Sequence, residues 1–135
     1  MNKRDLKIRC YKESLEDSLI SVEMTLNHFN KIKEKMGQFD EKILESDYVK
    51  TTIQLELTLS NLCIIIRKMT ENNIITIDSD LRVDINSIIH SNRFDYQKNV
   101  IVYSRKGEEK VDLGRILDFS HEILSNDNLF KENEL

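Results

Sequence analysis

A chain of 135 residues, 39% of them hydrophobic, has the length and the apolar content of one folded domain. Its formal net charge of -4 argues against a protein that coats nucleic acid through a basic surplus, and its two cysteines, Cys10 and Cys63, are too few for a disulfide framework or a zinc site. No secretory leader and no run of about 18 apolar residues is visible, so we expect a cytoplasmic protein without a membrane span or a bound metal.

The composition also predicts long helices and points to an origin. Proline is absent and only three glycines occur, so few residues would interrupt a helix. Lys, Asn and Ile are used heavily and alanine is absent, which indicates the AT-rich genome of a low-GC bacterium or its phage. The scarcity of glycine also leaves no phosphate-binding loop, and no cofactor is expected.

Two long amphipathic helices are predicted over about residues 3–36 and 40–70. In each, apolar residues recur mostly at gaps of three, four or seven, which places them on one helix face. The first stripe consists of Ile8, Leu15, Leu19, Val22, Leu26, Phe29 and Met36. The second consists of Tyr48, Leu55, Leu59, Leu62, Ile66 and Met69, and is widened by Ile53, Leu57, Ile64 and Ile65. The short link at Gly37 predicts an antiparallel hairpin, and the leftover apolar breadth of the second helix predicts a homodimer.

The second half of the chain predicts shorter elements. A third helix is expected over about residues 80–91, two strands over 94–96 and 100–103, a loop over 105–110, and a last helix from Asp112 to about Ser125. The predicted fold is all-α, an antiparallel helical bundle of about four helices with a small β-hairpin between the last two. Residues 1–125 would form this single domain, and residues 126–135 an acidic, flexible tail.

Three polar residues of the third predicted helix could carry chemistry. Arg82, Asn86 and His90 follow one another at intervals of four, which places them on neighbouring parts of one helix face. A guanidinium, an amide and an imidazole could bind a phosphate, orient a ribose hydroxyl and move a proton near neutral pH. A purely structural interpretation stays open, in which His90 ends the helix, Asn86 is a surface residue and Arg82 is solvated.

Residues 80–94, followed by a strand pair and a final helix, resemble the HEPN superfamily. These are small helical bundles common in bacterial toxin–antitoxin, abortive-infection and CRISPR-associated systems. Their hallmark is an arginine, a polar residue that is often asparagine, three further residues and a histidine near a helix end. Asn86 and His90 match this hallmark, whereas Ile85 occupies the arginine position and Arg82 lies one turn earlier. The resemblance implies a dimer in which the motif residues of two subunits meet and, in active members, cut RNA without metal.

The missing arginine favours a role without catalysis. We therefore expect a HEPN-like interaction protein of a bacterial or phage defence, counter-defence or toxin–antitoxin system that acts by binding a macromolecular partner, with a protein as the expected partner and RNA as a candidate. The first alternative is a metal-independent endoribonuclease, in which His90 is the general acid or base, Asn86 orients the substrate, and Arg82 or Arg93 binds the phosphate.

The second alternative is a small nucleic-acid-binding regulator. Around the predicted hairpin, the basic side chains that could contact phosphates are those of Arg93, Lys98, Arg105 and Lys106. Acidic residues interleave with them and lower the positive charge of this region. A steep fall of affinity with added salt would identify such a regulator.

Overall fold

A computed structural model describes residues 2–36, 41–96, 100–104 and 107–126, with residues 41–44 and 100–104 described by their backbone alone. The element order is α1 (Lys3–Lys35), α2 (Glu41–Glu71), α3 (Ser79–Ile89), β1 (Arg93–Tyr96), β2 (Val100–Ser104), β3 (Gly107–Val111) and α4 (Leu113–Ser125). The predicted all-α class with four helices is confirmed, and each predicted helix ends within two residues of its expected position.

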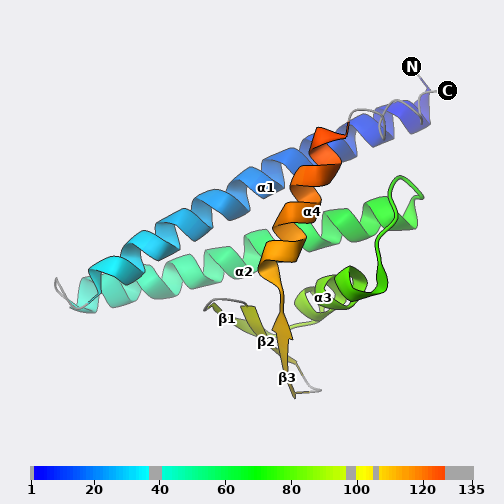
Figure 1. The fold of residues 1–135 in the computed structure, drawn as a ribbon. Helices are drawn as coiled ribbons and strands as arrows, with labels where there is room; N and C mark the ends of the chain where they lie inside the picture. The colour runs from blue at the N-terminus through cyan, green and yellow to red at the C-terminus, as the bar shows by residue number, and fades with distance from the viewer. Residues whose placement is uncertain (1, 37–40, 97–99, 105–106, 127–135) are drawn as a thin grey trace.

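The long helices α1 and α2 form an antiparallel hairpin that runs the length of the molecule (Figure 1). The apolar stripes predicted from the sequence face each other across this hairpin, with Leu15, Leu59 and Leu62 completely buried. Met36 is the exception, because it is the C-cap of α1 and is 43% exposed. At one end, the Phe29 ring packs against Tyr48 and Tyr96, with ring centroids 5.1 and 4.9 Å away. Burial of these stripes is the main force that pairs the two helices, because helices of this kind are stabilised by packing more than by propensity.

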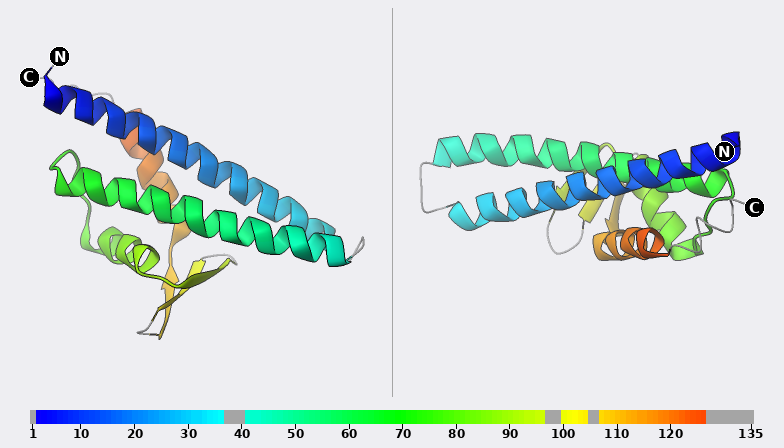
Figure 2. Two further views of the ribbon diagram at one scale, coloured as in Figure 1. Left: turned by 180° about the vertical axis from the view of Figure 1, so that it is seen from behind. Right: turned by 90° about the horizontal axis from the view of Figure 1, so that it is seen from above.

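The remaining elements form a second layer on one face of the hairpin, which Figure 2 shows from above. Helix α3 packs on α2, and α4 crosses the hairpin and contacts α1 and α3. Two aspartates cap the N-termini of these short helices: Asp78 accepts a hydrogen bond from the Leu81 amide at 2.8 Å, and Asp112 accepts one from the Arg115 amide at 3.1 Å.

The predicted hairpin is part of a larger sheet, which corrects the loop expected over residues 105–110. The antiparallel sheet has three strands in the order β1-β2-β3, and β3 covers Gly107–Val111. Gly107 begins this strand with a φ of 110°, a conformation that glycine adopts without steric cost. Hydrophobic periodicity cannot reveal β3, because its first four residues are exposed and Val111 alone is buried.

The apolar breadth of α2 is only partly buried. Leu62, Cys63 and Ile66 lie in the core, but Ile53, Leu57 and Ile64 are 51%, 67% and 42% exposed. These three residues were expected to widen the buried stripe. They face solvent because the second layer covers a different face of α2, where the carboxylate of Glu56 contacts β1.

One described stretch, Glu45–Glu71, meets the length and hydropathy criteria for a membrane-spanning helix, and 33% of its most apolar window is buried inside the protein. The core helix of a soluble domain meets the same criteria, so this finding is weak evidence for a membrane span. The cytoplasmic location expected from the sequence stays a prediction.

Candidate functional site

Two of the three predicted catalytic residues share a pocket. Arg82 and Asn86 line a cavity of about 290 Å³ between α3 and the C-terminal end of α2, with the apolar side chains of Ile77 and Ile85 beside them. Arg82 is exposed and forms no ion pair within the described part of the chain. A guanidinium and a carboxamide that line one cavity can together bind an anionic oxygen.

His90 is separated from this pocket. It is the C-cap of α3, where its backbone N–H donates to the Asn86 carbonyl at 3.0 Å, and its exposed side chain does not line the cavity. The geometry matches the structural interpretation, in which His90 simply ends the helix. The pocket can hold an anion, but the described residues that line it offer no imidazole to transfer a proton.

The structure adds a residue that sequence reasoning did not select. Arg67, near the end of α2, lines the same pocket together with Thr70 and Glu71. Its Nε atom lies 3.2 Å from a Glu71 carboxylate oxygen, so part of its charge is balanced within the helix. In the sequence, Arg67 and Glu71 form an ordinary i, i+4 surface pair, and nothing in their spacing indicates that α3 packs beside them.

The hallmark position is occupied by a core residue. Ile85 stands where the HEPN pattern has its arginine, and it is 1% exposed within the cluster formed by α2, α3 and their neighbours. A side chain at this position lies in apolar packing and borders the pocket, so a guanidinium there would lose most of its hydration. The residue that departs from the hallmark therefore belongs to the hydrophobic core of the domain.

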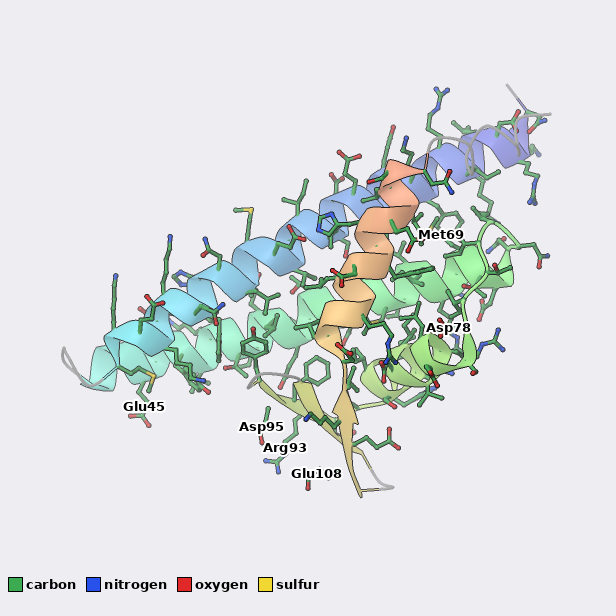
Figure 3. All side chains as sticks on the ribbon, in the orientation of Figure 1. Glu45, Met69, Asp78, Arg93, Asp95 and Glu108 are labelled. Atoms are coloured by element: carbon green, nitrogen blue, oxygen red, sulfur yellow. The ribbon has the colours of Figure 1, made fainter. Side chains whose placement is uncertain are left out.

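Of the four basic residues predicted to contact phosphates around the hairpin, the structure describes Arg93 alone. Lys98, Arg105 and Lys106 lie outside the described residues. Arg93 is exposed at the start of β1, on the same sheet as the exposed acids Asp95 and Glu108 (Figure 3). These carboxylates offset the positive charge that a nucleic-acid-binding sheet needs.

The most distinctive exposed feature is an apolar strip on α2, formed by Val49, Ile53, Leu57 and Ile64 and called the α2 strip below. Their exposed fractions are 51%, 51%, 67% and 42%. Intervals of four, four and seven residues keep them on one face of the helix, over about 22 Å at 1.5 Å per residue. Large apolar groups gathered on one helix face mark a contact surface more often than isolated ones do.

A second hollow lies between α1 and α2. It measures about 440 Å³ and is lined mostly by hydroxyl and amide groups, among them Ser18, Ser21, Thr58 and Asn61. These groups already have partners: Ser21 and Thr58 donate to carbonyls of their own helices at 3.0 and 2.9 Å, and Asn61 lies 3.3 Å from Ser18. The hollow is therefore part of the packing between the two helices.

The buried cysteine carries no reactive chemistry. Cys63 is completely buried, and desolvation together with nearby Asp84 raises the pKa of its thiol, which suppresses the thiolate. Cys10 is exposed near the start of α1. Within the described residues, no group of three or more His, Cys, Asp or Glu side chains could hold a metal ion.

Comparisons with family models, with curated proteins and with solved structures found no match to this chain.

Proposed function

We propose that this protein is a helical interaction protein that acts by binding a protein partner through the α2 strip, without catalysis. The setting we propose is a defence, counter-defence or toxin–antitoxin system of a low-GC bacterium or its phage. This setting is supported by the resemblance of the sequence around Asn86 and His90 to the HEPN superfamily. The observation that carries the proposal is the strip itself: four large apolar side chains, each at least 42% exposed, in one row.

The placement of the polar residues supports a role without catalysis. His90 lies outside the pocket that Arg82 and Asn86 line, and the hallmark position holds the buried Ile85. General acid–base catalysis needs the imidazole within hydrogen-bond reach of the reacting group. A binding role needs none of these residues, whereas it does need an exposed surface that gains from leaving water.

A matched pair of variants tests the proposal. Leu57 and Met24 are 67% and 68% exposed, on α2 and α1 respectively, so Leu57→Glu and Met24→Glu change equally exposed apolar residues inside and outside the strip. Tagged parent and variant proteins would be used to capture partners from the expressing cells. We expect one protein to bind the parent and Met24→Glu and to be lost with Leu57→Glu. Equal capture by all three proteins would reject the strip as the binding surface.

A second candidate function is supported by the pocket on α3. Because Arg67 joins Arg82 and Asn86 around one cavity, an RNA phosphate could bind there, as the endoribonuclease alternative requires. The parent and the variants Arg82→Ala and His90→Ala would be incubated with total RNA and tRNA in excess EDTA. Our proposal expects no cleavage by any of them. Cleavage by the parent that is lost in a folded His90→Ala protein would establish the nuclease instead.

A further inference from the structure

We propose that the chain bound along the α2 strip is a second copy of this protein, with the two α2 helices side by side and pointing in the same direction. The inference rests on the proposed function and identifies the protein that binds the α2 strip. It follows from the charges on the two borders of the strip and from the position of the sheet.

The two borders carry opposite charges at the start of α2. At 100° per residue, Glu45 and Glu56 lie about 60–85° to one side of the strip centre, and Lys50 and Lys68 lie about 55° to the other side. Towards the end of α2, Arg67 lies on the same side as the two glutamates, where its guanidinium pairs with Glu71. Glu45 and Lys50 are exposed, and Figure 3 shows Glu45 at the start of α2 on the side away from α1. A surface with one acidic and one basic border is complementary to itself.

Parallel pairing matches these borders. When two helices pack side by side in the same direction, a residue on one border faces the residue five positions later on the opposite border of the other helix. Glu45 of each copy then faces Lys50 of the second copy, and the symmetric contact forms twice around a twofold axis. The four apolar residues lie between these borders, each within about 45° of the strip centre, with Leu57 midway along the length of the strip.

Antiparallel pairing is disfavoured for two reasons. It would place Lys50 and Lys68 of both copies on one shared border, where like charges repel. It would also bring the two sheets together, because β1 is anchored beside the centre of the strip, where Glu56 accepts a hydrogen bond from the Phe94 amide at 3.0 Å. In the parallel arrangement the two sheets lie on opposite sides of the helix pair.

The oligomeric state tests the pairing. Sedimentation velocity at several micromolar concentrations should show a reversible dimer for the parent and for Met24→Glu. Leu57→Glu should weaken the dimer by about tenfold or more, because a charge would be buried at the centre of the contact. Circular dichroism should show equal helicity for the three proteins, since both residues are exposed in the folded monomer.

Engineered cysteines test the direction of pairing. In a Cys10→Ser background, where the remaining Cys63 is completely buried, Val49→Cys and Ile64→Cys would be oxidised separately and as a mixture. Parallel helices place each new thiol opposite its counterpart, so each single variant should form a disulfide-linked dimer. If only the mixture forms a dimer, with position 49 linked to position 64, the helices are antiparallel and the proposed arrangement is wrong.

A charge exchange completes the test. Glu45→Lys should weaken the dimer about threefold, and the double variant Glu45→Lys with Lys50→Glu should restore it. A parent that stays monomeric at all concentrations overturns the inference. In that case the capture experiment with Leu57→Glu still decides whether the strip binds a different protein, so failure of the dimer and failure of the proposed function can be told apart.

Discussion

The guanidinium of Arg115 on α4 lies 3.2 Å from the carboxylate of Asp84 on α3, measured from Nη1 to Oδ2. The Asp84 side chain is 11% exposed, whereas the Arg115 side chain is 43% exposed. The arginine therefore reaches from the surface to a buried acid and joins α4 to α3 through two residues that are 31 positions apart in the sequence. Asp112, the N-cap of α4, also lies 3.9 Å from the other terminal nitrogen of Arg115.

Removing this arginine should destabilise the domain. Arg115→Ala leaves the Asp84 carboxylate buried without its cationic partner, and we expect a loss of about 2 kcal/mol in the free energy of unfolding. Urea denaturation would measure it. Arg67→Ala is the matched control, because Arg67 pairs with the exposed Glu71 and its removal should cost at most about 0.5 kcal/mol. Equal losses for both variants would contradict a special role of the buried acid.

The same carboxyl group should make stability depend on pH. Burial raises the pKa of Asp84 above its ordinary value of 3.8, and Arg115 only partly opposes this effect. The folded protein thus binds the proton more tightly than the unfolded chain, so this group adds stability as pH falls through the folded pKa towards 3.8. The stability of Asp84→Asn relative to the parent should therefore increase with pH over that window. A difference in stability between the two proteins that does not change with pH would contradict this role of Asp84.

The position of β1 should depend on one hydrogen-bond acceptor, the carboxylate of Glu56. Glu56→Ala removes the carboxylate that accepts the hydrogen bond from the part-buried Phe94 amide, and we expect a loss of about 1–2 kcal/mol. Hydrogen exchange at the Phe94 amide should become faster. Glu56→Gln keeps an acceptor oxygen and should preserve most of the protection. Unchanged exchange in Glu56→Ala would show that β1 is held by its other contacts.

The aromatic contact at one end of the hairpin should be among the costliest to remove. Phe29 is completely buried between Tyr48 and Tyr96, so Phe29→Ala leaves a cavity and should cost about 3–5 kcal/mol by chemical denaturation. Met24→Ala, an exposed position on the same helix, should change stability by no more than about 0.5 kcal/mol. Comparable effects at both positions would contradict the packing described for Phe29.

The candidate site was only partly predictable. The spacing of Arg82 and Asn86 placed them on one face of α3, and in the structure both residues line one pocket. The same spacing included His90, but the helix ends at that residue and its side chain lies outside the cavity. Arg67 was not selected, because its place in the pocket depends on how α3 packs against α2.

Local patterns in the sequence determined the four helices, their ends and the caps at Asp78 and Asp112, because helix formation depends on periodicity and on side chains within a few residues. Tertiary structure alone decided that β3 pairs with β2, since four of its five residues are exposed and leave no hydrophobic pattern. It also decided the exposure of the α2 strip. Apolar residues lie on most sides of α2, so which of them stay in contact with water depends on where the second layer packs.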